Sequence, residues 1–221
     1  MAIHAFICGC AGLELTAEER RFVADARPWG LILFKRNIGD PAQVSKLTRD
    51  FREACGRADA PVLIDQEGGR VQRMGPPHWR RYPPAAMFER VANDPYVARE
   101  LARVSARMMA HDLLSVGINV DCVPVLDVPA PGSHQIVGDR AYAAGAERVA
   151  VLARAAAEGL MAGGVLPVVK HMPGHGRATA DSHLELPVVE APRAELEASD
   201  FLPFRALADM PMAMTAHIVF S

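Results

Sequence analysis

The 221-residue chain has little cysteine, few aromatic residues and almost no net charge. Its four cysteines, Cys8, Cys10, Cys55 and Cys122, form no CxxC pair. They therefore predict reduced, mostly buried thiols, as in a cytoplasmic protein, and not a disulfide scaffold. Only 6% of the residues are aromatic, and the formal charge is −2. This balance argues against a large nucleic-acid-binding surface.

Long apolar runs are also lacking. No stretch approaches the roughly 20 apolar residues that cross a bilayer, so we expect no membrane segment. The apolar start, residues 1–8, lacks the basic segment of a secretory signal, and we expect a cytoplasmic location. Half of the residues are hydrophobic, enough for one sizeable core in a single domain.

Short β-branched runs alternate with amphipathic segments along the chain. Strands are predicted over residues 3–8, 30–34, 61–64, 117–125, 165–169 and 211–216. Such an alternation is typical of a parallel sheet wound by βα units. An open doubly wound sheet and a closed barrel share this pattern, and periodicity alone does not distinguish them.

Helix signals occupy the intervals between these runs. Thr16 and Glu19 form a capping box that predicts a helix to about residue 25. Further helices are predicted to open at Asp40-Pro41, Asp94-Pro95 and Asp200. Apolar side chains at helical spacing share one face in three predicted helices. They are Val44, Leu47 and Phe51 after Asp40-Pro41; Val97, Leu101, Val104 and Met108 after Asp94-Pro95; and Val149, Leu152, Ala156 and Leu160 in a further helix that ends at Gly163-Gly164. An irregular, proline-rich loop is predicted to reach about residue 84.

Polar clusters directly follow the predicted strands. They lie at residues 65–70, at Asp127, at Lys170-His171 and at His217. Because an α/β barrel gathers the carboxyl ends of its strands at one mouth, we expect these clusters to meet there. The densest one continues through a Pro-Gly-His-Gly turn to Asp181-Ser-His183.

Asp181 and His183 are suited to proton transfer. In an extended segment, residues two apart point to the same face. An aspartate that accepts from one imidazole nitrogen fixes the tautomer of the ring, and the other nitrogen can then carry a proton. A structural hydrogen bond within the loop is the plainer interpretation of the same pair.

The run Lys-His-Met-Pro-Gly-His-Gly at 170–176, followed by Asp-Ser-His, resembles the signature of glycoside hydrolase family 3. Within the family it is similar to the single-domain bacterial β-N-acetylglucosaminidases, the β-hexosaminidases of cell-wall recycling. The resemblance runs from the Cys-Ala-Gly-Leu-Glu-Leu-Thr stretch at 10–16 to His217. It implies an α/β fold, the TIM (β/α)8 barrel, with about six βα units in a single domain over residues 1–221 whose C-terminal part is missing.

The resemblance also implies a retaining exo-β-N-acetylglucosaminidase that hydrolyses terminal N-acetylglucosamine from muropeptides. His183 matches the general acid/base and Asp181 the residue that orients it. The substrate-binding positions match Asp65, Arg73, Arg140, Lys170 and His171. No cofactor, metal, nucleic acid or membrane partner is implied. The family nucleophile is an aspartate in a Ser-Asp-Asp stretch, which does not occur before Ser221, so residues 1–221 by themselves are expected to be inactive.

Three alternatives stay open. One is a metal-dependent hydrolase, with ligands drawn from His171, His175, Asp181 and His183. The second is a non-catalytic sugar-binding remnant. The third is a phosphorylase, because a histidine acid/base does not repel an incoming phosphate as a carboxylate would. The sequence leaves the aglycone and the oligomeric state open.

Overall fold

The computed structural model describes residues 2–179 and 185–221. Its centre is a six-stranded parallel sheet with the spatial order β1-β2-β3-β6-β7-β9. The strands are β1 (His4–Cys8), β2 (Pro28–Leu33), β3 (Val62–Ile64), β6 (Val120–Asp121), β7 (Leu166–Met172) and β9 (Met212–Thr215). All six overlap the predicted segments, although β2 begins two residues earlier and β7 ends three residues later than predicted. The predicted parallel α/β sheet is confirmed.

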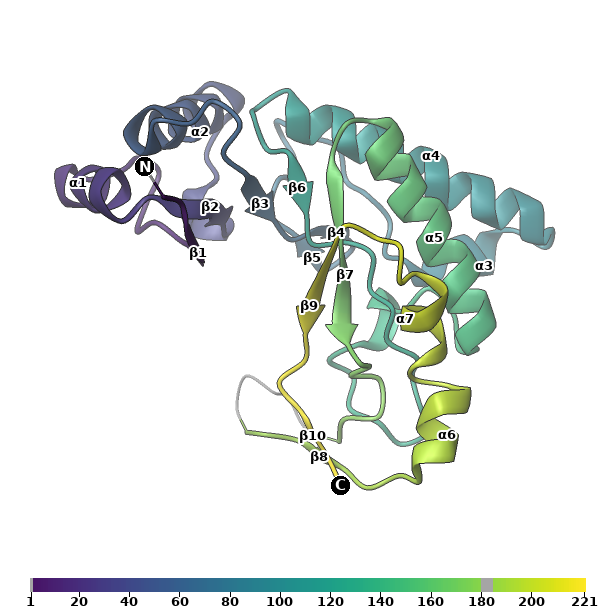
Figure 1. The fold of residues 1–221 in the computed structure, drawn as a ribbon. Helices are drawn as coiled ribbons and strands as arrows, with labels where there is room; N and C mark the ends of the chain where they lie inside the picture. Colours follow the sequence, from purple (N-terminus) through teal and green to yellow (C-terminus); the bar gives the residue numbers. More distant parts are fainter. Residues whose placement is uncertain (1, 180–184) are drawn as a thin grey trace.

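The spatial order of the strands repeats their order along the chain. A doubly wound sheet reverses its strand order at a switch point, and no reversal occurs here. Figure 1 shows the sheet curling from β1 to β9, with the helices on its outer side. The described residues thus form a half-barrel, whose two edge strands are β1 and β9. The sheet has six strands, so it does not show the closed eight-stranded barrel that the family resemblance implies.

Three of the described helices begin at a side-chain cap, namely those that follow Thr16, Asp40 and Asp94. The described helices are α1 (Ala17–Ala26), α2 (Pro41–Cys55), α3 (Ala86–Val91), α4 (Pro95–Leu114), α5 (Ala146–Ala162), α6 (Arg193–Ala198) and α7 (Leu202–Ala206). The predicted capping box is present, since Thr16 and Glu19 exchange hydrogen bonds at the start of α1. Short α3 and α6 were not predicted, because six residues display too little periodicity. Among the described helices, none is long and apolar enough to cross a membrane.

Helix α4 packs with the face opposite to the one marked by its large apolar residues. The predicted stripe of Val97, Leu101, Val104 and Met108 is exposed. The buried face is mainly alanine, and its members are Ala98, Ala102, Ala106 and Ala110. The predicted stripes of α2 and α5, in contrast, are buried. Small side chains let α4 approach α5 so closely that a Cβ on Gly159 would lie 2.1 Å from the carbonyl oxygen of Arg103.

Three loop regions differ from the sequence prediction. The polar cluster after β3 and the start of the expected irregular loop form an antiparallel hairpin of β4 (Gln66–Gly68) and β5 (Val71–Gln72). Of the strand predicted over 117–125, only β6 pairs as a strand, because Pro124 has no N–H for a sheet ladder. A separate parallel pair of β8 (Val188–Val189) and β10 (Val219–Phe220) was not predicted.

Candidate active site

A cavity of about 620 Å³ lies at the carboxyl ends of β3, β7 and β9. The β4–β5 hairpin and the short 3-10 turn η2 (Gly138–Arg140) complete its wall. All five predicted substrate contacts line it, namely Asp65, Arg73, Arg140, Lys170 and His171. In an α/β barrel this end of the strands is the one that carries active sites.

Lys170 is the charged centre of the cavity floor. Its side chain is only 1% exposed, and Nζ lies 2.8 Å from Asp65 Oδ1 and 2.6 Å from Glu67 Oε1. Burial by itself lowers the pKa of Lys170, but the charges of Glu67 and Asp65 outweigh it and raise that pKa above its usual value. The ammonium group therefore stays charged, and a buried charge needs such partners.

Glu67 joins Lys170 to Arg140. The guanidinium of Arg140 donates from Nε and Nη2 to the two Glu67 carboxylate oxygens, each at 2.8 Å. Burial raises the pKa of Glu67, but Lys170 and Arg140 together lower it to about 2. Glu67 was not predicted as a site residue. Its position two residues after Asp65 is the signal that was available, because alternate residues of an extended segment share a face.

Arg73 is brought to Asp65 by the hairpin. The buried Gln66 side-chain oxygen accepts from the backbone N–H groups of Arg73 and Met74, at 2.9 and 3.0 Å. Arg73 Nη2 then lies 3.4 Å from Asp65 Oδ2. Burial raises the pKa of Asp65, whereas Lys170 and then Arg73 lower it, and the net shift is downward. Asp65 is thus an ionised acceptor held between two cations.

His171 is oriented by Asp127. Its ring Nδ1 lies 2.7 Å from Asp127 Oδ2, and the other oxygen, Oδ1, accepts from the backbone N–H groups of His171 and His175 at 3.2 and 2.7 Å. Asp127 is fully buried; burial raises its pKa, but its bond to the His171 side chain and these contacts lower it below the usual value. An ionised acceptor at Nδ1 keeps the proton there and leaves Nε2 available to the cavity. Asp127 was noted as a residue after a strand but was not predicted as a site residue.

His175 packs beside His171 and is bonded to the same aspartate. Its ring lies 6.0 Å from that of His171, and burial lowers its pKa, so the ring is neutral. The backbone N–H of His175 donates to Asp127, and this bond gives the residue a structural role in the loop. Within the described residues its Nε2 has no hydrogen-bond partner.

The predicted acid/base pair, Asp181 and His183, lies outside the described residues. The segment before it is anchored: Arg177 donates to Asp200 Oδ2 and Glu195 Oε1, at 2.6 and 2.7 Å. Among the residues that the structure covers, no cluster of His, Cys, Asp or Glu could hold a metal ion. Since two of the four suggested ligands lie outside that part, the metal hypothesis stays untested.

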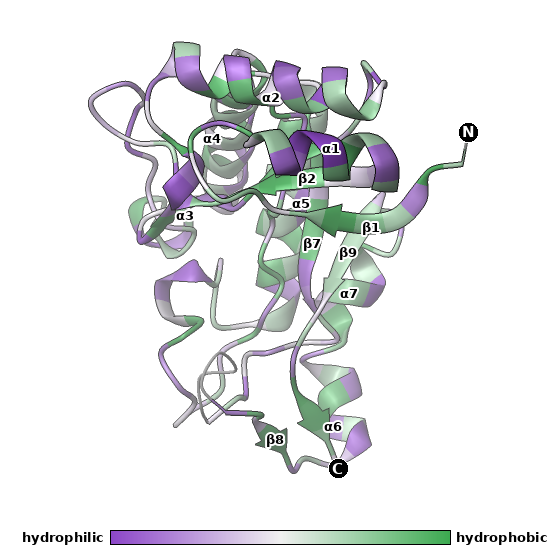
Figure 2. Ribbon diagram, turned by 90° about the vertical axis from the view of Figure 1, so that its left-hand side faces the viewer, coloured by the Kyte–Doolittle hydropathy of each residue, from purple (hydrophilic) through white to green (hydrophobic). Residues whose placement is uncertain are grey.

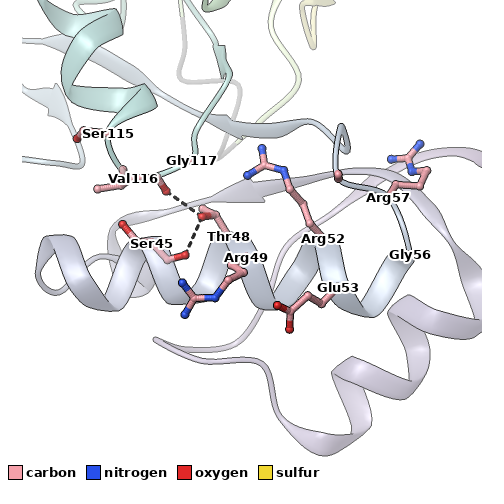
Figure 3. Close-up of a pocket in the computed structure, with 11 residues that line it drawn as sticks. Ser45, Thr48, Arg49, Arg52, Glu53, Gly56, Arg57, Ser115, Val116 and Gly117 are labelled. Carbon is pink, nitrogen blue, oxygen red and sulfur yellow. Dashed lines mark hydrogen bonds between the residues drawn. The ribbon is translucent and has the colours of Figure 1, made fainter.

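A second hollow lies at the opposite ends of the strands, between α2 and the turn that precedes β6 (Figure 3). Its polar side chains hold backbone carbonyl groups. Thr48 Oγ1 donates to Val116 O at 2.8 Å, Arg52 Nε to Ala60 O at 3.1 Å, and Arg57 Nη2 to Trp29 O at 2.6 Å. Arg49 and Arg52 point to different sides in Figure 3. The hydrogen bonds around this hollow therefore attach α2 to the sheet.

A curled, singly wound parallel sheet with a buried ionic network at the strand ends is typical of α/β-barrel enzymes. The chain belongs to glycoside hydrolase family 3, since residues 6–221 match the N-terminal domain of that family. The family resemblance drawn from the 170–183 motif is therefore confirmed.

The relatives have consistent names. The chain is 39% identical to a "Beta-hexosaminidase" of Alkalilimnicola ehrlichii, over all of this chain and 63% of the relative. It is 40% identical to a "Beta-hexosaminidase" of Methylococcus capsulatus, over 95% of this chain and 62% of that protein. The crystal structure of NagZ from Neisseria gonorrhoeae in complex with N-trifluoroacetyl-D-glucosamine has a TM-score of 0.91 at 33% identity, over 99% of this chain and 66% of that one. The chain thus spans less than two thirds of these relatives.

Proposed function

We propose that the protein is a retaining exo-β-N-acetylglucosaminidase that removes terminal N-acetylglucosamine from peptidoglycan fragments in the cytoplasm. The observation that carries the proposal is the convergence of five charged or titratable residues on one cavity at the strand ends. The names of the relatives support the same activity. The solved relative that holds an N-acylated glucosamine supports a sugar of this class as the ligand.

The ionic network is suited to holding sugar hydroxyl groups. Asp65 offers a carboxylate acceptor, Arg73 and Lys170 offer charged donors, and each is fixed by a partner of opposite charge. Such groups orient a sugar and discriminate against analogues, because a missing hydroxyl leaves a buried charge unpaired. His171 Nε2 adds one more oriented group.

We assign proton transfer to His183 and its orientation to Asp181. In the first step an aspartate nucleophile bonds to the anomeric carbon while His183 protonates the departing glycosidic oxygen. In the second step His183 takes a proton from water, which attacks the same carbon and frees the aspartate with overall retention. We propose that this nucleophile and the strands that close the barrel are supplied from outside residues 1–221. Neither step calls for a cofactor.

The experiment compares two leaving groups in the complete protein. His183→Ala is expected to lower turnover of a poor alkyl leaving group by roughly 10²- to 10⁴-fold, and that of an activated aryl glycoside far less, because a phenolate needs little protonation. His111→Ala, on the exposed side of α4, is the control and should match the wild type. Equal losses on both substrates would show that His183 is not the acid.

Three further measurements separate the alternatives. Cleavage of plain β-glucosides as fast as of N-acetylglucosaminides would contradict the proposed sugar specificity. Turnover that depends on phosphate would favour the phosphorylase. Loss of activity with a chelator, restored by zinc, would favour the metal-dependent hydrolase.

A further inference from the structure

The outer face of α4 carries a second apolar stripe that nothing covers within the described part of the chain. Val97, Leu101, Val104 and Met108 are 48%, 41%, 45% and 41% exposed. The alanine face opposite already packs against the core. The stripe is therefore additional to what the fold of this chain needs.

The spacing of the stripe is that of a helix-pairing seam. The steps from Val97 to Leu101, Val104 and Met108 are four, three and four residues. This is the a/d repeat with a period of 3.5 residues, narrower than the stripe by which a helix packs on a globular core. A seam of this kind is matched by another helix with the same repeat.

We propose that two copies of this chain associate through antiparallel pairing of their α4 helices about a two-fold axis. A two-fold axis makes each contact occur twice, with the same surface used by both copies. With the axis between Leu101 and Val104, Leu101 of one copy meets Val104 of the other. Val97 then meets Met108 at each end, and the whole stripe is covered.

The charges beside the seam favour this direction. Glu100 and Arg107 lie on the same edge, seven residues apart, so each faces the other residue of the second copy. Glu100 already accepts from Arg103 in its own helix, and Arg107 uses Nη1 for the Ala162 carbonyl, which leaves its other nitrogens for a new partner. A parallel pair would bring Arg107 to Asp112 instead. That carboxylate is already bound by the Tyr82 hydroxyl and by Arg80.

The position of α4 argues for a second copy as the occupant. α4 belongs to the crossover between β3 and β6, in the middle of the sheet, whereas strands that extend the half-barrel add at β1 and β9. A 20-residue helix is about 30 Å long and about 10 Å wide. One helix pair is therefore smaller than the roughly 800 Å² per partner of a standard interface, and we expect a dimer that dissociates in the micromolar range.

Sedimentation velocity on the complete protein, over roughly 1–100 μM, tests the proposal. The wild type is expected to shift from monomer to dimer in this range. Leu101→Glu buries a charge in the seam and is expected to weaken association at least about 100-fold. Val151→Glu, which alters an exposed apolar residue of α5, is the control and should dimerise as the wild type does. Unchanged aryl-glycoside turnover in both variants shows that the fold is intact.

Charge reversal tests the direction of pairing. Glu100→Arg and Arg107→Glu are each expected to weaken association about tenfold, because each places two like-charge pairs across the interface. The double variant restores opposite charges and should return to within about threefold of the wild type. A wild type that stays monomeric, a Leu101→Glu variant that dimerises normally, or a double variant no tighter than the single ones would overturn the proposal. So would a different protein bound at the seam.

Discussion

At the residue scale, two buried aspartates at strand ends have opposite electrostatics. Asp121 Oδ1 accepts from the backbone N–H of Gln66 at 3.0 Å, and Oδ2 has no partner among the described residues. Burial raises the pKa of Asp121 well above its usual value. Asp127 is equally buried but accepts three hydrogen bonds, which hold its pKa below the usual value. Asp121 is therefore favoured as a neutral acid and Asp127 as a carboxylate.

The two aspartates predict opposite effects of replacement by asparagine. For Asp121 the folded pKa exceeds the unfolded value of about 3.9, so the stability it supports falls as pH rises above that value. Asp121→Asn is expected to unfold at equal or higher urea concentration than the wild type at pH 7, with the difference vanishing near pH 4. The ionised Asp127 carboxylate stabilises the fold above pH ~4. Asp127→Asn is therefore expected to lower the free energy of unfolding there by about 1–3 kcal/mol. Urea unfolding of the complete protein at several pH values checks both, and effects of the same sign would contradict the assignment.

Breaking the buried ion cluster should be costly and non-additive. Lys170→Met leaves Asp65 and Glu67 without their shared cation and is expected to destabilise by about 3–5 kcal/mol. Glu67→Gln weakens the contacts of Lys170 and Arg140 in a similar way. The double variant should lose less than the two single variants together, by at least about 1 kcal/mol. A double-mutant cycle by thermal unfolding measures this, and strict additivity would show that Lys170 and Glu67 do not interact.

Much of the cavity wall could be predicted from the sequence, whereas its internal pairing could not. Asp65 and Lys170-His171 directly follow strands, and the strands are readable from their β-branched runs. The pairing of Glu67 with Arg140 joins residues 73 positions apart. Hydrophobic periodicity carries no information on such a contact, so the sequence does not single out Glu67 within the polar cluster at 65–70.

At the element scale, α4 shows why an apolar stripe does not by itself identify the core face. Periodicity predicts that Val97, Leu101, Val104 and Met108 lie on one side of α4, but it does not predict what that side contacts. The alanines on the opposite side pack closely because the neighbouring helix, α5, also has small residues there, including Ala153, Ala156 and Gly159. Close approach of two helices needs small side chains, and a large residue on that face would force them apart.

Gly159 provides the test of this packing. Alanine in a helix interior is normally up to about 1 kcal/mol better than glycine. Here the added Cβ would meet the carbonyl of Arg103 at 2.1 Å, and Gly159→Ala is expected to destabilise by about 1–3 kcal/mol. Gly12→Ala, in the loop before α1 with open space around the new Cβ, is the matched control and should change stability little. A Gly159→Ala variant as stable as the wild type would contradict the close approach.

At the scale of the whole molecule, the alternation of strands and helices predicts a parallel sheet but not its winding. The closed barrel was implied by the family resemblance alone, and the structure shows a half-barrel with strands in chain order. Its first strand, β1, is apolar except at its first residue, His4, and its arrow is green in Figure 2, yet Phe6 and Ile7 are exposed. In an open half-barrel such residues have neither a neighbouring strand nor a filled interior to cover them.

Residues 1–221 made in isolation are therefore expected to associate and to lack activity. Within residues 2–179 and 185–221, the backbone of β1 and β9 is unpaired on one side of each strand, which invites pairing with other chains. The proposed nucleophile is outside this segment. Light scattering should show species larger than a dimer, with no aryl-glycoside turnover. Replacing Ile7 by lysine charges the open edge and should reduce these species, whereas Val91→Lys on exposed α3 should not. A monodisperse, active protein of this length would contradict both the open-edge prediction and the location of the nucleophile.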